Sequence, residues 1–125
     1  MRTSVLAALF TLGASTAAFA DASVAGNWHA DLDSGVSIDM QVAPNGAWNS
    51  RTLQENQVVR EMRGTYRQQH AGTDTGTLVF VPKHYTSKIG KVTTETDRYE
   101  LGEAGKVLKL TSGGDTMVFE KREQR

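Results

Sequence analysis

A strictly alternating stretch at residues 36–42 constrains the fold of this chain more than any other feature of the sequence. Four apolar residues alternate there with three polar ones: Val36, Ser37, Ile38, Asp39, Met40, Gln41 and Val42. A period of two places successive side chains on opposite faces of a strand, so this strand buries one face and exposes the other. Residues 26–32 follow the same rule, with Trp28 on the apolar face. The Asp-Ser-Gly sequence at 33–35 predicts a turn between the two strands.

Turn signals divide the rest of the chain into further short strands. Asn45-Gly46 is a strong hairpin cue and predicts a third strand over residues 47–54. The pattern predicts five more strands, over residues 58–69, 77–83, 92–101, 107–111 and 117–122. Residues 58–69 also fit a helical spacing, so whether a helix lies within 54–69 stays open. The expected fold is all-β, an up-and-down antiparallel β-barrel of about eight strands with little or no helix.

The first twenty residues have the pattern of a secretory signal peptide. Arg2 provides a positive start, residues 5–12 form a short apolar run, and Ala18-Phe19-Ala20 is a small-x-small cleavage site. The apolar run is too short to span a bilayer. We therefore expect a signal peptide over residues 1–20, followed by a soluble domain over residues 21–125. That domain is expected in the periplasm or outside the cell, without stable membrane insertion.

Charge and motif content bear on the class of function. Without residues 1–20, the chain has 13 basic and 14 acidic side chains, so it has no overall field that would attract nucleic acid. It contains no cysteine, so no disulfide can assist folding. The common motifs of serine hydrolases, zinc proteases and phosphate-binding loops are not found in the sequence. We expect a protein that is not an enzyme and uses no cofactor.

Several short motifs together carry a resemblance that covers nearly all of residues 21–125. They are Gly26-Asn27-Trp28, Asn45-Gly46-Ala47-Trp48, Gly64-Thr65-Tyr66, Leu108-Lys109-Leu110-Thr111 and Phe119-Glu120-Lys121-Arg122. In these motifs the chain resembles the small bacterial lipocalin-like domains of the calycin group. The resemblance implies that Trp28 packs at the closed end of the barrel under a basic side chain of the last strand, Arg122 or Lys121. Such a contact is a cation–π interaction.

The opening of the chain resembles two further groups of small barrels. Gly26-Asn27-Trp28 with Gly64-Thr65-Tyr66 is similar to avidin-type barrels, which bind biotin with additional tryptophans from later strands. In this chain both tryptophans precede residue 50. The Gly-x-Trp opening also resembles periplasmic inhibitors of bacterial metalloproteases. Those inhibitors contain a disulfide and a longer N-terminal arm, which this chain lacks.

A set of large residues is predicted to face the barrel interior, as a packed core or as the wall of a cavity. It comprises Trp28, Ile38, Met40, Trp48, Met62, Tyr66, Phe80, Tyr99, Leu108, Leu110 and Phe119. An eight-stranded barrel is just wide enough to be filled by side chains or to hold one small ligand. If the interior is open, the expected lining of the pocket is Trp48, Met62, Tyr66, Phe80 and Tyr85.

Polar clusters provide alternative hypotheses. His29, Asp31 and Asp33 share one strand face and could hold a divalent metal, although an ordinary solvent-facing surface explains the same pattern. Glu95 and Asp97 also share a face, and the neighbouring basic residues favour a solvated, charge-mixed surface there. Arg60, Arg63 and Arg67 form a basic cluster that is typical of a charged outer face.

The function most consistent with these features is binding of a small, partly apolar ligand by an exported, non-enzymatic barrel. The first alternative is a protein-binding module, such as an inhibitor of an exported enzyme. It predicts a filled barrel with an exposed apolar patch on one rim. The second alternative is a periplasmic metal-handling protein that uses His29, Asp31 and Asp33.

Overall fold

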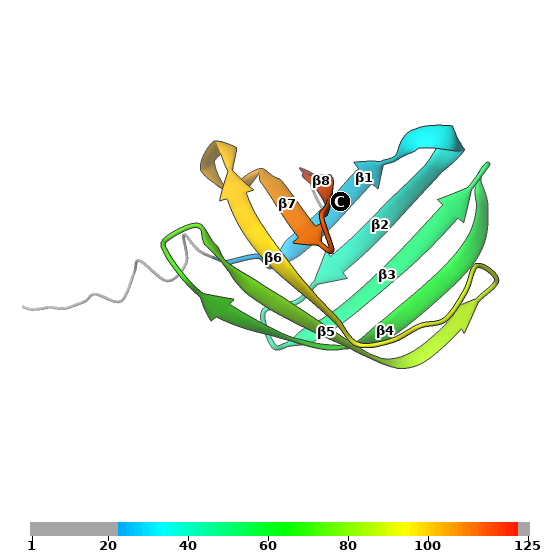
Figure 1. The fold of residues 1–125 in the computed structure, drawn as a ribbon, viewed down its shortest axis with the longest axis horizontal. Helices are drawn as coiled ribbons and strands as arrows, with labels where there is room; N and C mark the ends of the chain where they lie inside the picture. The colour runs from blue at the N-terminus through cyan, green and yellow to red at the C-terminus, as the bar shows by residue number, and fades with distance from the viewer. Residues whose placement is uncertain (1–22, 123–125) are drawn as a thin grey trace, which may run out of the picture.

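The computed structural model of the protein describes residues 23–122. Eight antiparallel strands follow one another around a closed barrel, and the last strand pairs with the first (Figure 1). The strands are β1 (Gly26–Asp31), β2 (Val36–Val42), β3 (Ala47–Gln54), β4 (Gln57–His70), β5 (Thr75–Ser87), β6 (Glu95–Gly102), β7 (Val107–Ser112) and β8 (Asp115–Arg122). The predicted up-and-down barrel is therefore confirmed. The signal peptide expected over residues 1–20 lies outside the described residues.

Short turns connect the strands, and helix is limited to two single 3₁₀ turns in the described part of the chain, η2 (Asp33–Gly35) and η3 (Glu103–Gly105). The segment 54–69, for which a helix was left open, contains the end of β3 and most of β4. Residues 23–122 include no helix with the length and hydrophobicity needed to cross a membrane. At the β2–β3 hairpin, the backbone N–H of Ala47 donates to Asn45 Oδ1 at 3.0 Å, as an Asx turn requires.

Strand β5 is longer than predicted, because it runs from Thr75 to Ser87 and so continues past Lys83, where the predicted strand ended. A β-bulge makes this possible: Gly64 pairs with Pro82 and Arg63 with His84, so Lys83 is an extra residue in β5. Strand β6 pairs with β5 only as far as Phe80. The second half of β5 therefore has β4 as its strand partner on one side only, which suits a proline that cannot donate a hydrogen bond.

One end of the barrel is closed by Trp28. Its Nε1–H donates to the carbonyl of Val24 at 2.9 Å, and both residues are fully buried. The Lys121 ammonium lies 5.4 Å from the centre of the Trp28 ring, which is cation–π geometry. Lys121 is also the cross-strand partner of Trp28, whereas Arg122 is paired with Asn27. Of the two residues suggested by the resemblance, Lys121 rather than Arg122 lies over the ring.

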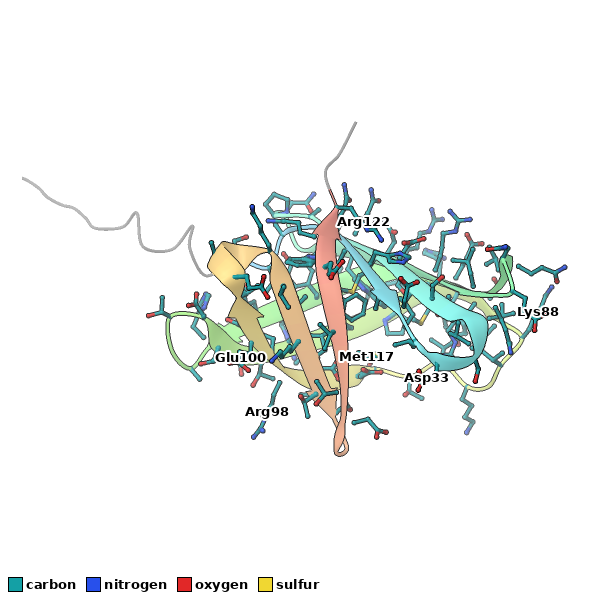
Figure 2. The ribbon with its side chains drawn as sticks, turned by 90° about the horizontal axis from the view of Figure 1, so that it is seen from above. Asp33, Lys88, Arg98, Glu100, Met117 and Arg122 are labelled. Carbon is teal, nitrogen blue, oxygen red and sulfur yellow. The ribbon has the colours of Figure 1, made fainter. Side chains whose placement is uncertain are left out.

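The opposite end is formed by the connections β1–β2, β3–β4, β5–β6 and β7–β8. Figure 2 shows Asp33 of the first connection and Lys88 of the third at this same end. Residues 88–94, between β5 and β6, form its longest connection. This segment is tied to β4, because the Lys88 backbone N–H donates to the carbonyl of Val59 at 2.8 Å. We call this end the mouth of the barrel.

Candidate functional site

A cavity of about 360 Å³ occupies the barrel on the side of the mouth. Its size is at the lower end of the range typical of small-molecule pockets. Most of its wall is apolar, with contributions from Leu32, Val36, Ile38, Met40, Trp48, Met62, Phe80, Ile89, Val92, Leu110, Met117 and Phe119. The polar and charged part of the lining comprises Ser50, Thr52, Arg60, Lys91, Thr93, Glu95 and Asp97. The barrel interior is therefore only partly filled by side chains.

Three of the five residues predicted to line a pocket are in this wall: Trp48, Met62 and Phe80. The rings of Trp48 and Phe80 pack with their centres 5.0 Å apart and form an aromatic part of the wall. Tyr66 packs against the core beyond the cavity, and its hydroxyl donates to the carbonyl of Ala43 at 2.7 Å. Tyr85 is 54% exposed and lies in a shallow depression over β3, β4 and β5.

Two polar atoms in the cavity-lining residues have no hydrogen-bond partner. They are Nε1 of Trp48 and Oδ1 of Asp97, and both are buried. Buried polar groups are nearly always hydrogen-bonded in folded proteins, and each one that is not costs about 1–3 kcal/mol. Both atoms are closed off from water, and therefore also from the open part of the cavity, so they lower the stability of the folded protein.

Asp97 was expected on a solvated face, and the structure contradicts this: its side chain is 1% exposed. Burial, together with the neighbouring carboxyl group of Glu95, raises the pKa of Asp97 to about 8, while a hydrogen bond with Ser112 opposes the shift. The group is therefore protonated in most molecules at neutral pH. The sequence contained a signal for this position, because Asp97 shares its strand face with the buried Tyr99 and Leu101.

Arg60 fixes the segment that borders the mouth. Its Nε–H donates to Ser87 Oγ at 3.1 Å, and its Nη2 donates to the carbonyl of Lys91 at 3.3 Å. Ile89, which is 46% exposed, and Val92 of this segment line the cavity. The sequence placed Arg60 in a basic outer cluster, but its guanidinium group instead connects β4 to residues 88–94. The Arg60 side chain therefore holds this part of the entrance to β4 together with the backbone hydrogen bond from Lys88 to Val59.

The candidate metal ligands form a hydrogen-bonded group on the outside of the barrel. His29 Nδ1 lies 2.6 Å from Asp39 Oδ1, and His29 Nε2 lies 3.0 Å from Asp31 Oδ1. These hydrogen bonds, mainly the one with Asp39, raise the pKa of His29. Asp33 lies in the η2 turn. Within residues 23–122, no three or more His, Cys, Asp or Glu side chains are placed so that they could hold a metal ion.

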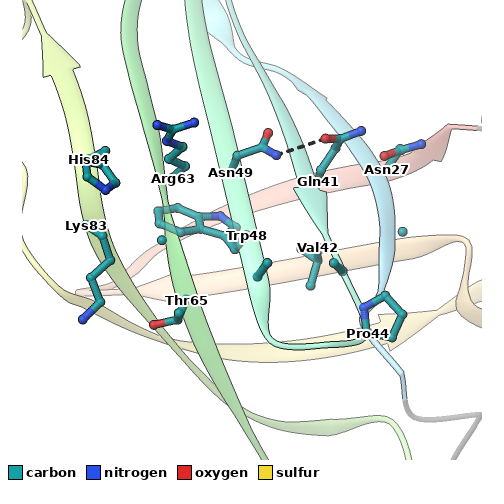
Figure 3. Close-up of a pocket in the computed structure, with 14 residues that line it drawn as sticks. Asn27, Gln41, Val42, Pro44, Trp48, Asn49, Arg63, Thr65, Lys83 and His84 are labelled. Atoms are coloured by element: carbon teal, nitrogen blue, oxygen red, sulfur yellow. Dashed lines mark hydrogen bonds between the residues drawn. The ribbon is translucent and has the colours of Figure 1, made fainter.

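A second, shallower hollow of about 660 Å³ lies on the outer face of β1 to β5 (Figure 3). A row of polar side chains crosses it in register: Asn27, Gln41, Asn49, Arg63 and His84. Asn49 Nδ2 donates to Gln41 Oε1 at 3.0 Å. Trp48 lines this hollow as well as the barrel cavity, but the hollow is the more open of the two to solvent. We therefore take the barrel cavity as the candidate site.

Comparisons of the chain with protein-family models, curated proteins and solved structures find no match. The lipocalin-like resemblance therefore remains a prediction.

Proposed function

We propose that the protein is a non-enzymatic binding protein that holds a small, partly apolar molecule in its barrel cavity. The observation that carries the proposal is a partly open cavity of about 360 Å³ inside the barrel, whose wall is mainly apolar and includes a few polar side chains such as Ser50 and Thr52. Binding sites for small molecules combine apolar walls with a few polar groups that orient the ligand. We further propose that the protein acts after export, because residues 1–20 have the pattern of a signal peptide.

The same cavity favours this function over a protein-binding module. The alternative predicted a filled barrel, whereas a cavity of about 360 Å³ opens at the mouth. The half-exposed apolar side chains, Tyr85, Ile89 and Val118, belong to three different segments: β5, the β5–β6 connection and β8. One of them, Ile89, is itself part of the cavity lining.

The proposal can be tested with a neutral fluorescent probe, N-phenyl-1-naphthylamine, which brightens on entering an apolar site. Met117 and Val118 provide a matched pair of variants, since they are neighbours on β8 that point to opposite faces. Met117 lines the cavity, and Val118 is about half exposed on the outside. Met117→Trp fills part of the cavity and is expected to weaken probe binding at least tenfold, whereas Val118→Trp is expected to bind as the wild type does.

Both variants must retain the β-sheet circular dichroism spectrum, so that loss of binding is not loss of fold. Equal probe binding by the wild type and a folded Met117→Trp variant would place the probe outside the barrel and contradict the proposal. The proposal would also be contradicted if the wild type bound neither this probe nor any other apolar molecule of similar size.

A further inference from the structure

The hollow on the outer face of β1 to β5 contains positive charges that no carboxylate compensates. Arg63 and Lys83 line it, and the described residues of its lining include no aspartate or glutamate. Within residues 23–122, neither of these two side chains forms an ion pair. The neighbouring row of the same face differs, because Arg51 Nε there lies 3.5 Å from Glu61 Oε2. The hollow is therefore a local site of uncompensated positive charge.

The β-bulge of β5 brings Lys83 and His84 to this hollow together. Successive residues of a regular strand point to opposite faces, but Lys83 is the extra residue of the bulge and lines the hollow beside His84. The bulge requires glycine at position 64, because a Cβ there would overlap the carbonyl oxygen of Val81 and lie 2.9 Å from the backbone nitrogen of Lys83. Bulges next to functional sites re-aim side chains in this way. The strand pairing itself therefore places both side chains at the hollow.

Amide side chains continue the row from Arg63 across the hollow (Figure 3). Asn49 is the cross-strand partner of Arg63, and Gln41 is the partner of Asn49. The hydrogen bond from Asn49 Nδ2 to Gln41 Oε1 fixes both amides and leaves Asn49 Oδ1 as an acceptor and Gln41 Nε2 as a donor. Hydroxyl groups both donate and accept, so they suit these atoms. Neighbouring strands lie about 5 Å apart, so the row from Arg63 to Gln41 spans about 10 Å.

We propose that the outer hollow is a second binding site, which takes a small hydroxylated molecule carrying an oxyanion, such as a sugar phosphate or a sugar acid. The planar guanidinium of Arg63 matches two oxygens of a phosphate or carboxylate, and the Lys83 ammonium adds a second positive charge. Asn49 and Gln41 bind the hydroxyl groups of the same molecule. This inference goes beyond the proposed function, because it concerns the outside of the barrel and a hydrophilic ligand.

Four probes test the class of ligand: glucose 6-phosphate, glucuronate, glucose and inorganic phosphate. Their affinities are measured by NMR, from the side-chain amide signals of Asn49 and Gln41 as each probe is added. At least one of the two anionic sugars is expected to bind about tenfold more tightly than glucose, because it gains charge-assisted hydrogen bonds. The same sugar is expected to bind several-fold more tightly than inorganic phosphate, because its hydroxyl groups reach the amides. The order of the two anionic sugars shows whether the site prefers phosphate or carboxylate.

Arg63 and Arg67 provide a matched pair of variants. Both are exposed on the outer face of β4, but only Arg63 lines the hollow. Four residues of strand separate them by about 13 Å, which exceeds the screening length of about 8 Å at physiological ionic strength. Arg63→Gln is expected to weaken binding of the preferred anionic sugar about fivefold or more, whereas Arg67→Gln should change it less than about twofold. Both variants should keep the β-sheet circular dichroism spectrum.

Three results would overturn the proposal. The first is that glucose binds as tightly as both anionic sugars, or that neither anionic sugar binds. The second is that inorganic phosphate binds as tightly as the preferred sugar, because the hydroxyl groups would then not be recognised. The third is that Arg63→Gln and Arg67→Gln weaken binding equally. Binding of N-phenyl-1-naphthylamine in the barrel does not depend on any of these results, so failure of this inference is distinguishable from failure of the proposed function.

Discussion

The pH dependence of the free energy of unfolding is expected to show that Asp97 has a raised pKa in the folded protein. An aspartate in an unfolded chain releases its proton near pH 3.8, whereas burial raises the pKa of Asp97 to about 8 in the folded protein. Between these values the folded state holds one more proton than the unfolded state, so the free energy of unfolding falls as pH rises. The contribution of this group is fully present below pH 3.8 and is lost as pH rises through 8.

The size of the effect follows from the same linkage. One extra bound proton changes the free energy of unfolding by at most about 1.4 kcal/mol per pH unit. Between pH 5 and pH 7 the wild type is therefore expected to lose up to about 3 kcal/mol through Asp97. Asp97→Asn removes the proton exchange while keeping a similar shape, so its stability should vary less with pH over this interval.

Urea unfolding at a series of pH values, followed by tryptophan fluorescence, measures this difference. Asp115→Asn serves as the control, because Asp115 is exposed at the start of β8. The control is expected to follow the wild-type curve. If Asp97→Asn and the wild type lost stability in parallel between pH 5 and pH 7, Asp97 would not hold an extra proton in the folded state. In that case Asp97, which is the only fully buried acidic group among residues 23–122, would not have the raised pKa described above.

Two further predictions concern the closed end and the outer face of the barrel. Lys121→Met removes the cation that lies over the Trp28 ring. We expect it to lower the free energy of unfolding by about 0.5–1 kcal/mol and the melting temperature by a few degrees. Arg122→Met is expected to lower both by less. Equal losses in a thermal melt would argue against the cation–π contact. Asp39→Asn removes the main cause of the raised pKa of His29, so an NMR titration should find the His29 pKa lowered toward 6.5. The hydrogen bond stabilises protonated His29, so the variant should lose at most about 1 kcal/mol relative to the wild type at pH 5.5 and less at pH 9. A larger loss at pH 9 would contradict this sign.

The sequence predicted the fold well because strand alternation and hairpin turns are local signals. Residues 36–42 and Asn45-Gly46 define their strands and turn without reference to the rest of the molecule. The length of β5 was not predictable in the same way. Its continuation past Pro82 depends on the bulge opposite Gly64, and a bulge is defined by the partner strand.

The candidate site was predictable only in part for the same reason. Trp48, Met62 and Phe80 face the interior by simple alternation. Tyr85 follows the bulge, in the part of β5 that lacks β6 as a neighbour, so local alternation does not determine its exposure. Asp97 shows the opposite error: the neighbouring basic residues suggested a solvated surface, although Asp97 alternates in step with the inward-facing Tyr99. Whether the interior is open depends on packing between distant strands, which no local pattern specifies.

Native mass spectrometry of the protein purified from the cells that produce it tests the central claim most directly. The account predicts a folded protein carrying one additional small molecule. Met117→Trp, purified in the same way, should lack that mass, and Val118→Trp should retain it. A wild-type protein that carries no small molecule and binds none of the apolar probes in solution would contradict the claim that the barrel cavity is a ligand site.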